Sequence, residues 1–136
     1  MMKTAVIYWS GTGNTEAMAK AVAEGANAEL FEVSAFNGNV TDYEAVAFGC
    51  PAMGAEVLEE DVFEPFFASV EHLLQGKKTL LFGSYGWGDG EWMREWEKRA
   101  KSAGAVLVGG QGLMVNEMPS DEDLENCRAI GKKLTE

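Results

Sequence analysis

Residues 5–15 read Ala5-Val6-Ile7-Tyr8-Trp9-Ser10-Gly11-Thr12-Gly13-Asn14-Thr15 and establish the architecture of the chain. An apolar run ends at Trp9 and a helix-like run begins near Thr15, which predicts a strand, a tight turn and a helix N-terminus. The turn offers hydroxyl and carboxamide groups, and its two glycines let backbone N–H groups face inward. Such donors at a helix N-terminus bind phosphate. Because the turn contains no Lys or Arg, neutral donors alone would hold the phosphate of a small-molecule ligand.

Short apolar runs alternate along the chain with segments whose apolar residues recur every three to four positions. The apolar runs predict strands at Thr4–Trp9, Glu29–Val33, Ala45–Gly49, Thr79–Gly83 and Ala105–Val108, the last resuming at Leu113–Val115. The periodic segments predict helices over 15–25, 62–74, 92–100 and 124–134. We therefore expect one α/β domain spanning residues 1–136, a doubly wound, five-stranded parallel sheet with helices on both faces.

The composition is strongly acidic, with 22 Asp and Glu against 11 Lys and Arg and a net charge of −11. Nucleic acid is a poor partner because its phosphates require basic surface, whereas a protein with a positive docking face is favoured. Cys50 and Cys127 lie far apart and the chain has one histidine, so we expect buried thiols and no metal site. The chain shows neither a signal peptide nor a long apolar segment, so we expect a cytoplasmic protein without membrane insertion.

Three segments follow predicted strand ends, at 10–15, 51–56 and 84–90. The carboxyl ends of parallel strands meet at one edge of a sheet, where ligands of such folds bind. In the third segment Trp87 lies between two glycines, so its ring can stack on a planar ligand or, alternatively, close the edge of the core as a lid. In the second segment Met53 offers a thioether, Gly54 a flexible peptide and Glu56 a hydrogen-bond acceptor. Alternatively, Met53 only fills space in the core, Gly54 only forms a turn and Glu56 is a solvated acid.

These segments carry a resemblance to a known family. They read Trp-Ser-Gly-Thr-Gly-Asn-Thr from residue 9, Gly-Cys-Pro-Ala-Met-Gly from residue 49 and Gly-Ser-Tyr-Gly-Trp-Gly-Asp-Gly-Glu-Trp-Met from residue 83. In this order and spacing they resemble flavodoxins, most closely the short-chain flavodoxins of anaerobic bacteria. The likeness covers essentially the whole chain, including Val115-Asn116-Glu117. It implies the flavodoxin-like strand order 2-1-3-4-5 and FMN as cofactor. The sequence departs from the family at Ala55, where relatives often carry a polar residue.

The resemblance also implies roles for individual residues. Trp87 would stack on the outer face of the flavin, Met53 would pack on the inner face, and Glu56 would accept a hydrogen bond from the N3 side. The Gly54–Ala55 peptide would turn its carbonyl toward N5–H when the flavin takes up one electron and a proton. The phosphate would be bound by Ser10, Gly11, Thr12, Gly13, Asn14 and Thr15. The ribityl chain and ring would be lined by Ser84, Tyr85, Gly86 and Asp89, with Ala52 and Gly88 as further cofactor contacts and with Trp9 and Trp92 shielding the phosphate.

Acidic residues surround the expected site, at Glu56, Glu59, Glu60, Asp61 and Glu64 on one side and Asp89 and Glu91 on the other. Their charge would oppose further reduction of an anionic flavin, as a strong reductant requires. The favoured function is therefore a low-potential one-electron carrier, a monomer that docks transiently on larger redox proteins with basic faces. A flavin enzyme of the NAD(P)H:quinone reductase type is the alternative, and a nucleotide-binding or signalling module is a third. The third lacks support because Glu16 replaces the last glycine of a dinucleotide fingerprint and no P-loop lysine is present.

Overall fold

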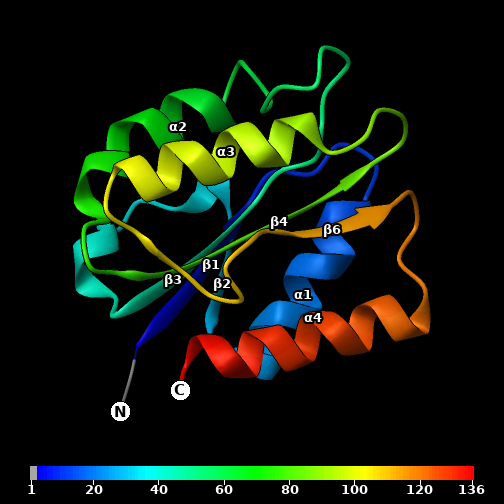
Figure 1. Cartoon of the computed structure of the whole chain (residues 1–136). Helices are drawn as coiled ribbons and strands as arrows, with labels where there is room; N and C mark the ends of the chain where they lie inside the picture. Colours follow the sequence, from blue (N-terminus) through cyan, green and yellow to red (C-terminus); the bar gives the residue numbers. More distant parts are fainter. Residues whose placement is uncertain (1–2) are drawn as a thin grey trace.

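The apolar runs form a parallel sheet in the computed structural model, which describes residues 3–136 (Figure 1). Its strands are β1 (Thr4–Tyr8), β2 (Glu29–Glu32), β3 (Ala45–Gly49), β4 (Lys78–Tyr85), β5 (Val106–Leu107) and β6 (Leu113–Asn116). They follow the order β2-β1-β3-β4-β5, and β6 also pairs with β4. Because β5 pairs with residues 78–79 of β4 and β6 with residues 82–85, the two segments share the fifth strand position. The predicted α/β fold and strand order are confirmed.

Within the described residues, four α-helices cover the sheet, two on each face (Figure 1). They are α1 (Asn14–Ala26), α2 (Phe63–Val70), α3 (Glu91–Ser102) and α4 (Asp121–Leu134), with short 3-10 turns η1 (Val33–Ala35), η2 (Val40–Asp42) and η3 (Glu71–Leu73). The aromatic side chains of α2 and α3 pack against one face of the sheet, and the alanines of α1 with the apolar stripe of α4 pack against the other. Each strand of the sheet centre is therefore buried on both sides, which explains its continuous apolar sequence.

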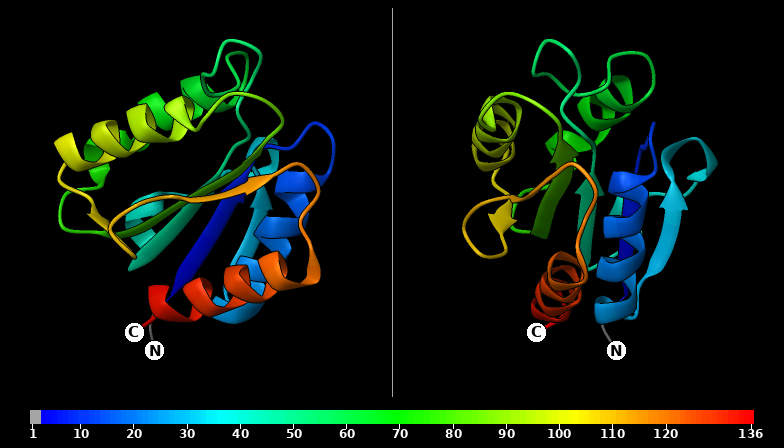
Figure 2. Two further views of the ribbon diagram at one scale, coloured as in Figure 1. Left: turned by 45° about the vertical axis from the view of Figure 1, so that its right-hand side comes forward. Right: turned by 90° about the vertical axis from the view of Figure 1, so that its right-hand side faces the viewer.

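Helices α1 and α4 lie side by side on their face of the sheet (Figure 2). Glycines permit this close approach. A Cβ atom added at Gly25 would lie 1.9 Å from the carbonyl oxygen of Arg128, and one at Gly131 would lie 2.4 Å from the carbonyl oxygen of Val22. The small side chains of the first helix thus serve helix–helix packing as well as packing on the sheet.

The observed helix boundaries lie within two residues of the predicted ones except at the end of α2 and the start of α4. The helix predicted over 62–74 ends at Val70 and continues as the 3-10 turn η3, while Pro65 is accommodated within its first turn. Helix α4 begins at Asp121, three residues before Leu124, the first residue of its apolar period, because Ser120 and Asp123 form a reciprocal capping box. The first turn of α4 is acidic, so apolar periodicity alone did not reveal it. Within residues 3–136 no helix is long and apolar enough to cross a membrane.

Candidate functional site

A cleft of about 240 Å³ opens at the carboxyl edge of the sheet, where the loops after β1, β3, β4 and β6 converge. The cleft is lined by Trp9, Gly11, Thr12, Asn14, Pro51, Ala52, Met53, Ser84, Tyr85, Gly86 and Glu117. Eight of these belong to the predicted cofactor-binding set: Gly11, Thr12, Asn14, Ala52, Met53, Ser84, Tyr85 and Gly86. The three predicted loops therefore meet at one place because parallel strands deliver their carboxyl ends to one edge.

The loop after β1 is held by its own first side chain. The hydroxyl oxygen of Ser10 accepts hydrogen bonds from the backbone N–H groups of Gly13 at 3.1 Å and Glu16 at 3.2 Å. Gly13 adopts a φ of 97°, which favours glycine and brings the chain into α1. Within residues 3–136, the backbone N–H groups of Gly11, Thr12 and Asn14 donate to no acceptor. Free N–H groups at a helix N-terminus fit an anionic ligand such as phosphate.

Thr15 and Ser84 are both buried, and their hydroxyl oxygens lie 2.8 Å apart in a hydrogen bond. The backbone N–H of Ser84 also donates to the Thr15 hydroxyl at 3.3 Å. These bonds join the start of α1 to the end of β4. The side chain of Thr15 therefore positions two walls of the cleft relative to each other.

The loop after β3 is fastened at Cys50. The Cys50 backbone N–H donates to the carbonyl of Phe82 at 3.1 Å, and its own carbonyl accepts from the indole N–H of Trp92 at 3.1 Å. Trp92 is only 2% exposed and packs in the core beside Tyr85. This differs from the prediction that Trp92 shields the phosphate. Its large apolar ring is buried on the core face of α3, and its one donor is used to hold the loop.

Residues 53–56 of this loop form a tight turn. The Glu56 backbone N–H donates to the carbonyl of Met53 at 2.8 Å, and the Met53 N–H donates to the carbonyl of Val57 at 3.0 Å. Gly54 and Ala55 are exposed at the tip, and a Cβ atom at Gly54 would meet nothing within 4 Å. The peptide at the tip therefore has room to rotate.

Glu56 has an uncommon backbone conformation and a buried side-chain oxygen without a hydrogen-bond partner within residues 3–136. Its backbone adopts a φ of 52°, in the left-handed region that is uncommon for a residue other than glycine. Its carboxylate oxygen Oε1 is buried and has no hydrogen-bond partner within residues 3–136. A buried acceptor of this kind is costly, so Oε1 is available to a donor that a ligand could supply. The carboxylate lies against Gly88, where an added Cβ atom would be 2.5 Å from it.

The loop after β4 carries Trp87, which is 64% exposed. Gly88 and Gly90 on its far side adopt φ angles of 88° and 96°. The carboxylate of Asp89 pairs with the guanidinium of Arg94 at 2.9 Å, and this hydrogen bond and charge lower the pKa of Asp89. Asp89 therefore contacts the first turn of α3 through an exposed ion pair. Asp89, Trp87 and Glu56 are not among the residues that line the cleft, although each belongs to a loop that lines it.

Three cleft residues lie outside the predicted phosphate and ring contacts: Trp9, Pro51 and Glu117. Trp9 was predicted only as a shield of the phosphate, and its ring lies 3.1 Å from the position of a Cβ atom at Gly11. Glu117 adopts a φ of 59°, and its backbone N–H donates to the carbonyl of Tyr85 at 2.7 Å. Its place directly after the last strand was the available signal, because that strand ends at the same edge as the others.

Glu59 was predicted to belong to the acidic surface around the site, but the structure buries it at 6% exposure. Its carboxylate accepts hydrogen bonds from the backbone N–H groups of Asp61 at 2.9 Å and of Val62 and Phe63 at 2.8 Å. Burial by itself raises the pKa of the carboxyl group, but these three donors outweigh it and leave the pKa below the usual value. In the sequence Glu59 is simply an acid that precedes a helix. In the fold its carboxylate is buried and caps the N-terminus of α2.

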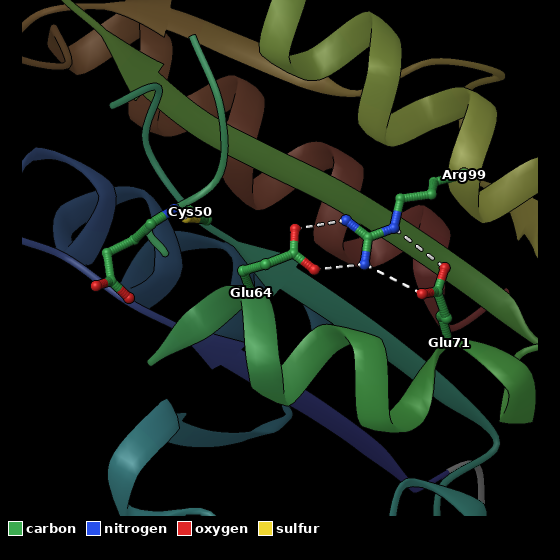
Figure 3. A network of polar contacts seen from close by, with 5 residues as sticks. Cys50, Glu64, Glu71 and Arg99 are labelled. Atoms are coloured by element: carbon green, nitrogen blue, oxygen red, sulfur yellow. Dashed lines mark hydrogen bonds and ion pairs between the residues drawn. The ribbon is translucent and has the colours of Figure 1, made fainter. Parts of the chain in front are cut away.

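Both thiols are free and buried, as predicted. Burial is the main cause that raises the pKa of the Cys50 thiol to about 12, so it is un-ionised at neutral pH. Figure 3 shows a second polar cluster behind the loop, in which Arg99 lies between the carboxylates of Glu64 and Glu71. Its two N–O distances to Glu64 are 2.7 Å and those to Glu71 are 3.1 Å, so one guanidinium joins α3 to α2 and η3.

Comparison with known proteins agrees with this architecture. Residues 6–131 match the family model described as flavodoxin. The chain belongs to the flavodoxin family. It is 46% identical to a flavodoxin of Megasphaera elsdenii over 93% of this chain and 94% of the relative, and 43% identical to one of Clostridium beijerinckii over 95% and 96%. The solution structure of the two-electron reduced Megasphaera elsdenii flavodoxin superposes with a TM-score of 0.83 at 42% identity, covering 97% and 98% of the two chains.

Flavodoxins bind FMN, and membership of the family confirms this prediction of the cofactor. The residues of the cleft and of its loops fit FMN. Free N–H groups after β1 suit its phosphate, the side chains of Trp9, Met53 and Tyr85 give the cleft apolar walls, and the unpartnered carboxylate oxygen of Glu56 suits a ring N–H donor.

Proposed function

We propose that this flavodoxin-family protein is a low-potential one-electron carrier that docks transiently on larger redox proteins with basic faces. FMN supplies the redox chemistry when bound. The chain supplies a phosphate-binding turn at residues 10–15 and a cleft between the turn at 53–56 and the loop carrying Trp87. We assign the cofactor contacts predicted from the sequence to this site, except that Thr15, Asp89 and Trp92 act by positioning its walls.

The distribution of charge carries the proposal of a carrier. Exposed acids gather on the loops and helix starts at the carboxyl edge of the sheet: Glu60, Asp61, Asp89, Glu91, Glu117, Asp121 and Glu122. Lysines gather at the strand starts and helix ends on the opposite edge: Lys3, Lys77, Lys78, Lys101, Lys132 and Lys133. The acidic edge opposes the addition of negative charge in the cleft, which lowers the potential. The same field steers the cleft toward a positively charged partner.

The turn at 53–56 gives the chain a means of responding to reduction. Its ends are fixed by the bonds of Met53 to Val57 and Glu56, whereas the peptide between Gly54 and Ala55 lies exposed at the tip. Rotation of that peptide would offer its carbonyl oxygen to a proton held in the cleft. Neither Gly54 nor Ala55 has a polar side chain, so the polar groups that these two residues offer are those of the backbone.

An anaerobic reductive titration of the FMN-loaded protein, followed by absorbance, tests the proposal. We expect two separate one-electron steps, the second at a markedly lower potential than the first. A single two-electron step would contradict the one-electron role while leaving the FMN site intact. Steady oxidation of NADH or NADPH by the pure protein with a quinone as acceptor would instead support the reductase alternative.

The docking surface is tested by the salt dependence of electron transfer to a basic redox protein. Cytochrome c, which carries a positive face, is a suitable probe. We expect the bimolecular rate to fall steeply as salt rises from about 10 mM to about 300 mM, because the Debye length shortens from roughly 30 Å to below 8 Å. A rate that does not change with salt would contradict docking through the acidic edge.

A further inference from the structure

The loop that carries the 53–56 turn begins and ends at a single point of the fold. We define this cofactor loop as residues 51–58. The backbone N–H of Glu59, directly after the loop, lies 3.4 Å from the sulfur of Cys50, directly before it. The loop therefore leaves the sheet and returns to the same place, so the position of its tip depends on how firmly its two ends are held.

The first end of the cofactor loop is fixed to the sheet and to α3. The N–H and carbonyl groups of Cys50 bond to Phe82 and Trp92, both at 3.1 Å. Position 83 must be glycine for this approach, because a Cβ atom at Gly83 would lie 2.1 Å from the Cys50 carbonyl oxygen. These contacts place the start of the loop in the hydrogen-bonded framework of the sheet.

The second end is fixed by one side chain. The carboxylate of Glu59 accepts hydrogen bonds from the N–H groups of Asp61, Val62 and Phe63 at the start of α2, and these groups have no other acceptor among residues 3–136. The helix dipole adds to this attraction, because a carboxylate is stabilised at a helix N-terminus. Helix α2 is itself tied to α3 through Arg99 (Figure 3). The loop end is therefore joined to a rigid pair of helices through Glu59.

We propose that Glu59 is a positioning residue for cofactor binding, which keeps the cofactor loop in its binding-competent shape without touching the ligand. The inference rests on the proposed function of the cleft. Glu59 is absent from the lining of the cleft, so its effect is transmitted through the backbone to Met53 and Glu56. Loss of the negative charge and of one acceptor oxygen loosens the second end of the loop. Ligand binding must then restore part of an order that the wild-type loop already has.

Glu59→Gln and Glu60→Gln form a matched pair for the test. Each removes one negative charge at adjacent positions, but Glu60 is exposed and its side chain forms no hydrogen bond within residues 3–136. We expect the dissociation constant for FMN, measured by fluorescence quenching on the apoprotein, to rise about tenfold in Glu59→Gln and less than about twofold in Glu60→Gln. We also expect a change in the separation of the two one-electron potentials only in Glu59→Gln.

Amide hydrogen exchange of the apoprotein provides a readout that does not require FMN. We expect faster exchange across residues 51–58 in Glu59→Gln than in Glu60→Gln, with unchanged exchange in β1, β3 and β4. Equal exchange and equal FMN affinity in the two variants would overturn the inference even if the wild type proves to be an electron carrier. If Glu59→Gln does not fold, Glu59→Asp, which keeps the charge on a shorter side chain, is compared with Glu60→Asp by the same measurements.

Discussion

Substitution of Gly88 by alanine tests the contact between the two loops that flank the cleft. Gly88 has a φ of 88°, and a Cβ atom there would lie 2.5 Å from the Glu56 carboxyl group. The left-handed backbone costs about 1 kcal/mol for an L-residue. The carboxyl group is the end of a flexible side chain, so it can move away at little further cost in stability. It would then no longer accept a hydrogen bond from a ligand in the cleft, which is worth about 1.5–3 kcal/mol for a charged acceptor.

Gly88→Ala is therefore expected to weaken FMN binding by roughly 10- to 150-fold. Gly76→Ala is the matched control, because Gly76 has a φ of 74° but a Cβ atom there meets nothing within 4 Å. Both variants are expected to lose about 1 kcal/mol of unfolding free energy in urea, whereas only Gly88→Ala loses FMN affinity in a fluorescence titration. The reasoning is refuted if Gly88→Ala binds FMN within threefold of the wild type, or if Gly76→Ala weakens binding equally.

Other predictions concern stability. Arg99→Ala is expected to cost about 2 kcal/mol, because the guanidinium is intermediate in exposure and both its carboxylate partners are left unpaired. Calorimetry should show a midpoint lower by about 7 °C, and a shift below about 2 °C would contradict the role of the cluster. Thr15→Val is expected to cost about 1–3 kcal/mol by leaving the buried Ser84 hydroxyl without its partner, as urea unfolding would measure. The lowered pKa of Glu59 means that its contribution is complete above the unfolded-state pKa and is lost as pH falls through the folded-state pKa. The stability difference between wild type and Glu59→Gln should therefore be constant above about pH 5 and narrow below it, and an opposite trend would contradict the capped carboxylate.

Much of the site was predictable because its loops are contiguous in sequence. The turn at 10–15 and the loop around Trp87 each combine glycines with polar or aromatic residues at a strand end, and that local pattern is enough to mark them. The parallel fold then requires their convergence at one edge. The burial of Glu59 was not predictable in this way. Its side chain looks suited to the acidic surface by type and position, and only the packing of α2 on the sheet directs it inward.

The sequence by itself determined the alternation of strands and helices, the strand ends that carry the site and the excess of acid, since these depend on residue type and local period. The tertiary structure decided which donors and acceptors are satisfied. Thr15 bonds to Ser84 across 69 positions of the chain, and Trp92 bonds to Cys50 across 42. The carboxylate of Glu56 retains a buried oxygen without a partner because Gly88 lets it approach from a different loop. Such pairings depend on distances between segments that are remote in sequence, and local propensity carries no information about them.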